Sequence, residues 1–225
     1  MFIDDKELAN LKRLADERDA KNGIGKNFSG NSNKERSKSD FYQTPYSLTE
    51  LLLASEEFLC HPDEVILEPC RGQDAIVKVL KRQGYANIVA YDLTDGVDFL
   101  QETRKFHTII TNPPYRLAFE FIKKAKEVSK DFYFLLPLSY LHGQQRYEEI
   151  YQDKEFPLRS VGVFTRYPLL EETVREDGKH KTGMQVFAWF NWQKLLFWEK
   201  ERPEEVLEPH IYWLDNNSYV CRKGE

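Results

Sequence analysis

The chain has 225 residues, with 32 Lys and Arg against 37 Asp and Glu, so its formal net charge is −5. This length suits one α/β domain with modest additions and excludes two large domains. The acidic balance excludes a surface that is basic throughout, although a local basic face remains compatible with it. No apolar run is long enough to span a membrane, and the first residues lack the features of a signal peptide, so we expect a cytoplasmic protein. Three cysteines at positions 60, 70 and 221 form no recognised metal spacing, which predicts no metal site.

The first forty residues differ in composition from the rest and are predicted to form an N-terminal arm, 1–40. An apolar face with leucines at 8, 11 and 14 predicts a helix over 4–20. Residues 21–38 are rich in Gly, Ser and Asn and carry five Lys or Arg against one Glu, which predicts a flexible basic linker. The linker is either a solvated tether or a clamp on a nucleic acid.

Strands and helices then alternate, beginning with Ser47 and Glu50, which have the spacing of a capping box and predict a helix running toward Leu59. The later elements are predicted as strand 65–67, helix 74–83, strands 88–91 and 106–111, helix 117–129, strand 132–136, helix 141–152, and strands 158–164 and 184–191. This alternation predicts a doubly wound, mostly parallel sheet in one domain over 41–192. A polar excursion at 165–183 is either a surface hairpin or a recognition element, and 193–225 is predicted as a short tail whose segments 211–214 and 219–221 form a hairpin.

The most informative motif is Asn112-Pro113-Pro114-Tyr115, directly after the strand 106–111. The prolines end the strand and hold the backbone extended at its carboxyl end, where open α/β sheets bind ligands. An amide side chain, a carbonyl without a sheet partner and an aromatic ring suit the binding of an amino group on a flat base. The alternative is a strand followed by a turn with a buried Tyr.

Acidic residues and a glycine follow the earlier strands. Glu68 and Gly72 lie at the first strand-to-helix turn, where a glycine permits a tight backbone bend. Asp92 ends the next strand, the position that binds ribose hydroxyls in doubly wound folds. Asp98 and Phe99 follow, and could offer a carboxylate and an aromatic wall to an adenine ring. For both aspartates the alternative is a helix N-cap.

In this order the motifs resemble those of the S-adenosylmethionine-dependent adenine-N6 DNA methyltransferases. The segment Phe41 to Pro45 is similar to the N-terminal cofactor motif of that family, and Ile66 to Gly72 to its cofactor loop. Met184 to Trp189 resembles its late motif near the target base. The resemblance spans roughly 41–192 and implies a Rossmann-like methyltransferase fold. Asp74 stands where the family usually has a second glycine. The family also usually carries a sizeable recognition domain, and here we expect only the excursion 165–183 and the short tail in its place.

The resemblance also implies residue roles. Cofactor contacts would come from Thr44, Pro45, Glu68, Gly72, Asp92, Asp98 and Phe99, and catalysis from Asn112, Pro113, Pro114 and Tyr115. The implied reaction is methyl transfer from S-adenosylmethionine to the N6 amine of adenine in DNA, with DNA as partner and without a metal. The alternatives are methylation of RNA bases, methylation of a protein glutamine amide, and a binding module that has lost catalysis.

Overall fold

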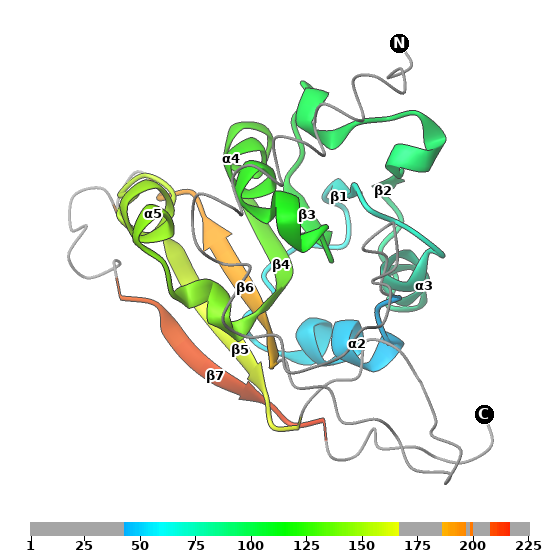
Figure 1. Ribbon diagram of the computed structural model, residues 1–225. Coiled ribbons are helices and arrows are strands. Elements are labelled where there is room, and N and C mark those ends of the chain that lie inside the picture. The colour runs from blue at the N-terminus through cyan, green and yellow to red at the C-terminus, as the bar shows by residue number, and fades with distance from the viewer. Residues whose placement is uncertain (1–42, 167–185, 197–198, 200–207, 217–225) are drawn as a thin grey trace, which may run out of the picture.

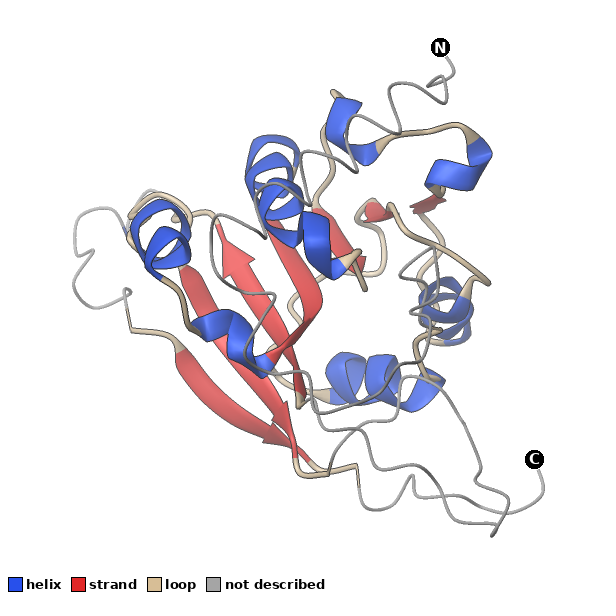
Figure 2. Cartoon of the chain, in the orientation of Figure 1, coloured by secondary structure: helices blue, strands red, loops and turns tan. Residues whose placement is uncertain are grey.

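The structure is a computed structural model that describes residues 43–166, 186–196, 199 and 208–216. Within these ranges seven strands form one sheet in the order β2-β1-β3-β4-β6-β5-β7, with helices on both faces (Figures 1 and 2). Strand β6 runs antiparallel to both of its neighbours, and the other described pairs are parallel. The predicted doubly wound, mostly parallel sheet is therefore confirmed.

The elements have the following bounds. The strands are β1 Ile66–Glu68, β2 Ile88–Ala90, β3 Thr108–Thr111, β4 Asp131–Pro137, β5 Leu158–Phe164, β6 Phe187–Gln193 and β7 His210–Leu214. The α-helices are α2 Tyr46–Ala54, α3 Ala75–Arg82, α4 Ala118–Val128 and α5 Gln144–Arg146. Short helical turns are Leu93–Asp95, Phe99–Gln101, Tyr115–Leu117 and Leu138–Leu141, and a π-helical turn, Tyr147–Tyr151, continues α5.

The central strands of the sheet, β1, β3, β4 and β6, are buried on both faces, whereas β2 is half-buried and β7 is largely exposed. Phe132 and Phe134 of β4 pack in the core beneath α4, whereas Tyr133 and Leu135 pack in a second core with α2 and α3. This division follows from the alternation of side chains along a strand. Because both faces are covered, the strands read as continuous apolar runs, which is why most of them could be predicted from sequence.

Two helix predictions were wrong in detail. The capping box does not form, because Pro45 is the N-cap of α2 and Ser47 lies inside the helix. The helix ends at Ala54, where the Ser55 hydroxyl donates to the Leu52 carbonyl oxygen, and does not continue toward Leu59. The helix predicted over 141–152 begins only at Gln144, since Gly143 has a φ of 134° that a helix does not accept.

The chain beyond 193 contributes to the sheet. Strand β7 pairs in parallel with β5, so 210–214 forms an edge strand of the main sheet. The second part of the predicted hairpin, the N-terminal arm, the first residues of the Thr-Pro motif, nearly all of the excursion 165–183 and Met184 lie outside the described residues. The boundaries 1–40, 41–192 and 193–225 stay predictions. Among the described residues, no helix is long and apolar enough to cross a membrane.

Candidate functional site

The sheet topology brings the predicted site residues to one edge. Strand β1 pairs in parallel with both β2 and β3, so the carboxyl ends of these three strands lie side by side (Figure 1). Glu68 ends β1, Asp92 follows β2 and Asn112 follows β3. Residues separated by more than forty positions therefore share one edge of the sheet, as expected for a ligand site of an open α/β fold.

Asn112 is held by hydrogen bonds on both sides of its amide. Its Nδ2 donates to Thr44 Oγ1 at 3.1 Å, and its Oδ1 accepts the Tyr115 hydroxyl at 3.0 Å. Thr44 is buried, and Pro45 after it caps α2. The Thr-Pro segment and the Asn-Pro-Pro-Tyr segment, 68 residues apart, thus meet in one place.

Pro113 and Pro114 end β3, and the backbone at Pro114 is extended, as predicted from sequence. Pro113 is buried, and Pro114 adopts an extended conformation, with φ −60° and ψ 117°, before the helical turn that begins at Tyr115. The Tyr115 ring lies 5.5 Å from the ring of Phe187 on β6. Phe187 is therefore a neighbour of the site, and it lies within the segment Met184 to Trp189 that resembles the late motif of the family.

Glu68 is the most unusual group at this edge. Its side chain is 1% exposed, and Oε1 accepts hydrogen bonds from Thr111 Oγ1 at 2.5 Å and from the Cys70 amide at 2.8 Å. Its Oε2 is buried, and no hydrogen bond from the described residues reaches it. Burial raises the pKa of this carboxyl to about 8, and the charges of Asp92 and Asp74 add to the rise. A cationic ligand would favour its ionised form.

Asp92, which follows β2, is hydrogen-bonded to the turn between β1 and α3. Oδ2 accepts the Gly72 amide at 3.2 Å, and Oδ1 accepts the Thr94 amide at 3.1 Å as the cap of a short helical turn. Gly72 has a φ of 48°, the left-handed region that favours glycine. The N-cap alternative for Asp92 is thus observed. Each carboxylate oxygen can accept more than one hydrogen bond, so the capping role leaves Asp92 able to bind ribose hydroxyls. That second role stays a prediction.

Asp98 also caps a turn but keeps one oxygen without a partner. Oδ1 accepts the Leu100 amide at 2.9 Å, whereas Oδ2 is buried and receives no hydrogen bond from the described residues. Phe99 is 2% exposed and packs against Phe121 at 4.9 Å between ring centroids. The Phe99 ring belongs to the core, so in this structure it does not present the open aromatic wall that the sequence suggested.

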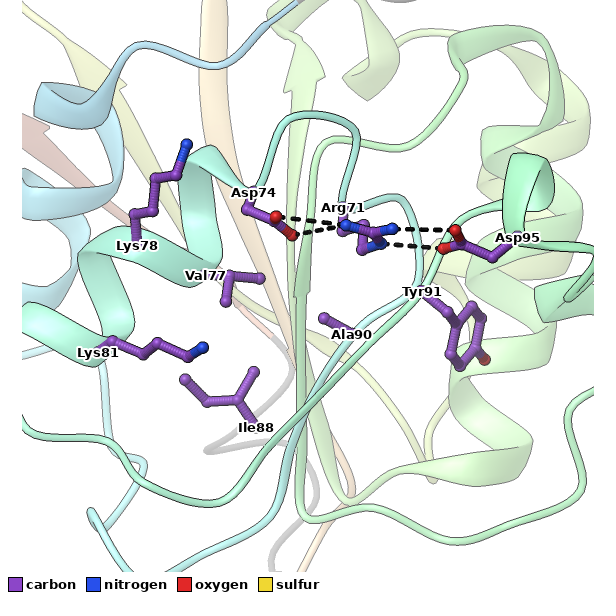
Figure 3. A pocket seen from close by; sticks show the side chains of 9 residues that line it. All are labelled: Arg71, Asp74, Val77, Lys78, Lys81, Ile88, Ala90, Tyr91 and Asp95. Carbon is purple, nitrogen blue, oxygen red and sulfur yellow. Dashed lines mark hydrogen bonds and ion pairs between the residues drawn. The ribbon is translucent and has the colours of Figure 1, made fainter.

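The sequence analysis did not single out Arg71, whose guanidinium pairs with two carboxylates beside the turn between β1 and α3. Arg71 contacts Asp74 at 3.2 Å and Asp95 at 2.9 Å, and Figure 3 shows its guanidinium between the two carboxylates. These residues line an open groove of about 600 Å³ between α3 and β2. Arg71 lowers the pKa of Asp95 through its hydrogen bonds. The Asp74 carboxylate is turned toward Arg71, which compensates its charge.

Asp74 has a φ of 62° at the start of α3, in the left-handed region where the resembling family has glycine. We expect Asp74→Ala to lower the free energy of unfolding by about 1 kcal/mol, and Asp74→Gly to leave it unchanged or raise it by up to about 1 kcal/mol, because only glycine adopts this φ without steric cost. Urea unfolding at neutral pH measures both. Equal destabilisation by the two variants would assign the effect to the lost Arg71 pair instead.

Comparison with known proteins shows similarity of fold. No family model and no curated protein matches the sequence. A protein from Listeria monocytogenes assigned as a class I S-adenosylmethionine-dependent methyltransferase is similar with a TM-score of 0.56 at 13% identity, over 80% of this chain and 68% of that one. The methyltransferase subunit of a type I restriction-modification system from Streptococcus thermophilus gives 0.50 at 12% identity, over 82% of this chain and 49% of that subunit. The present chain therefore spans about half of that subunit. These similarities establish a Rossmann-like methyltransferase fold.

Proposed function

We propose that this protein transfers a methyl group from S-adenosylmethionine to the N6 amine of adenine in DNA. One observation carries the proposal: the Asn112 amide is fixed at the carboxyl end of β3 between Thr44 and Tyr115. Because Nδ2 is engaged by Thr44, the amide oxygen is the atom that faces Tyr115. An acceptor oxygen beside an aromatic ring is what recognition of a base amine requires.

The amine of adenine is a weak nucleophile, because its lone pair is delocalised into the ring. The Asn112 Oδ1 and the Pro113 carbonyl oxygen would accept its two hydrogens and favour a pyramidal, more nucleophilic nitrogen. In the free protein the Tyr115 hydroxyl donates to that same Oδ1. The amine would replace this hydrogen bond, and the Tyr115 ring would stack on the base. A base in a duplex has to leave the stack to reach this position.

The residues around the edge also fit the cofactor. S-adenosylmethionine carries a sulfonium, an ammonium group and an adenine amine, and when bound it supplies the methyl group in activated form. Glu68 and Asp98 each hold a buried carboxylate oxygen without a hydrogen bond from the described residues. Acceptors of this kind are costly unless a donor pairs with them, and the cofactor provides such donors. The remaining catalytic contribution is orientation for in-line attack.

DNA is preferred over RNA and over a protein amide for two reasons. The Thr-Pro segment lies before the cofactor loop, as in the DNA-modifying family that the sequence resembles, and Thr44 contacts Asn112. One protein of similar fold is a restriction-modification methyltransferase subunit. Incubation with labelled cofactor and DNA, RNA or protein, followed by mass spectrometry of the digests, tests this choice. We expect N6-methyladenine from DNA. Label in RNA or in glutamine would contradict the substrate, and absence of label with cofactor bound would indicate a binding module.

A conservative change of Asp98 tests the cofactor position separately. Asparagine keeps the size, but its amide can offer an oxygen to only one of the two groups, the Leu100 amide and a ligand amine. We expect Asp98→Asn to weaken S-adenosylmethionine binding by about 1–3 kcal/mol, measured by titration calorimetry. The matched control is Asp63→Asn, an exposed carboxylate. Equal affinity in Asp98→Asn and the unmodified protein would place the adenine of the cofactor elsewhere.

A further inference from the structure

A thiol, an imidazole and a carboxylate converge at the opposite edge of the sheet. Cys60 and Glu64 lie in the connection from α2 to β1, and His107 directly precedes β3. The Cys60 sulfur, a Glu64 carboxylate oxygen and a His107 ring nitrogen all lie within 4.8 Å of one another. Asn112 follows the other end of β3, so this cluster is separate from the candidate methyl-transfer site.

The cluster is partly enclosed and rich in negative charge. Cys60 is 6% exposed, and the nearby Asp131 is 3% exposed. Burial, with smaller contributions from Asp131 and Glu64, raises the pKa of the Cys60 thiol to about 12. The positive charge of the exposed Lys130 acts to lower the pKa of both His107 and Asp131. A divalent cation would compensate the carboxylates and convert the thiol into a thiolate ligand.

The hydrogen bonds around His107 leave one contact that needs a cation or a proton. The Thr108 hydroxyl donates its single hydrogen to Asp131 Oδ1 at 2.6 Å. In the second contact of this hydroxyl, 3.1 Å between Thr108 Oγ1 and His107 Nδ1, the donor is therefore His107 Nδ1. In the neutral imidazole Nε2 then carries a lone pair, and it faces Glu64 Oε1 at 2.6 Å. Two lone pairs repel at this distance unless something positive lies between them.

We propose that Cys60, Glu64 and His107 bind one Zn²⁺, with water at the fourth tetrahedral position. Sulfur, imidazole nitrogen and carboxylate oxygen are the ligands that zinc prefers. Around a tetrahedral zinc with bonds of about 2.1 Å, a ligating nitrogen and oxygen lie ~3.4 Å apart. Glu64 Oε1, which is 2.6 Å from His107 Nε2, therefore has to move slightly away from it when zinc binds. Binding releases the Cys60 proton. The relay from His107 Nδ1 through Thr108 to Asp131 is the outer support that a ligating histidine usually has.

The proposed ion has a structural consequence. It would tie the loop that follows α2 to the start of β3, whose far end carries Asn112. The sequence analysis predicted no metal site, because the three cysteines form no recognised metal spacing. The three proposed ligands lack a standard spacing too. Only the fold brings them together.

Cobalt provides a direct test on the full chain after treatment with a chelator. We expect one Co²⁺ per chain with a thiolate-to-cobalt charge-transfer band, displaced by Zn²⁺. Cys60→Ser should abolish the band and weaken Zn²⁺ binding by about 100-fold or more, and Asp131→Asn should weaken it by about 10–100-fold. Glu64→Gln alters a partly exposed side chain, preserves the fold and should also weaken binding by at least about tenfold.

Cys70→Ser and Cys221→Ser are the matched thiol controls and should keep the band. No charge-transfer band at millimolar Co²⁺ would overturn the proposal. A band that persists in Cys60→Ser would overturn it as well, and so would a band that disappears in Cys70→Ser or Cys221→Ser. The readout needs no methyl-transfer activity, so its outcome is independent of the proposed function.

Discussion

Replacing Asn112 by Ala is expected to lower methyl transfer by about a hundredfold or more while leaving the affinity for S-adenosylmethionine unchanged. The amide oxygen would stabilise the amine as it becomes pyramidal, an interaction made chiefly in the transition state, and loss of one such hydrogen bond costs about that much in turnover. Single-turnover rates with labelled cofactor, together with calorimetry of cofactor binding, measure the two quantities separately.

Two further variants separate chemistry from structure. Tyr115→Phe removes only the hydroxyl that donates to Asn112 Oδ1, so turnover should be retained because the target amine no longer competes with it. Thr44→Val removes the partner of Asn112 Nδ2 and leaves the amide free to turn, so turnover should fall less than in Asn112→Ala. A collapse of cofactor affinity in Asn112→Ala would make Asn112 a structural residue.

Much of this fold could be predicted from sequence because local and global signals agree. The central parallel strands β1 and β3 are buried on both faces, so they are short apolar runs, and the chemical groups follow the carboxyl ends of these runs. The parallel pairing of β1 with β2 and β3 then turns sequence order into spatial proximity. Asn112, Glu68 and Asp92 were located at the sheet edge in this way.

The contacts that define the site could not be predicted, because they depend on side-chain packing across the sheet. Nothing in the local sequence indicates that Thr111 donates to Glu68 or that Phe99 turns into the core. The left-handed backbone at Asp74 and its pairing with Arg71 were not predicted, although a glycine at this position in the family that the sequence resembles is compatible with that backbone. The Ser47 capping box failed since Pro45 already starts the helix with its own fixed backbone.

Glu68 should make folding stability fall as the pH rises toward 8. The folded state keeps this carboxyl protonated up to a pKa of about 8, whereas in the unfolded chain it ionises near pH 4.3. Between these values the folded state binds more protons, so each pH unit lowers the free energy of unfolding by up to about 1.4 kcal/mol. Asp131, whose pKa is raised to about 7 by burial, adds to the same trend, so the comparison requires Glu68→Gln as reference. Urea unfolding at pH 5.5 and 7.5 should give a smaller pH dependence in Glu68→Gln.

The same proton should be released when a cationic cofactor binds beside Glu68, because the ligand favours the carboxylate. Affinity for S-adenosylmethionine is therefore expected to rise between pH 6 and 7.5, by up to about tenfold per pH unit. The Glu68→Gln variant, which cannot ionise, should bind more weakly at pH 7.5 and show little change over this range. Calorimetry in two buffers of different ionisation enthalpy counts the released proton directly. A pH dependence that is identical in Glu68→Gln would mean that the cofactor cation lies away from β1, even if methyl transfer itself is observed.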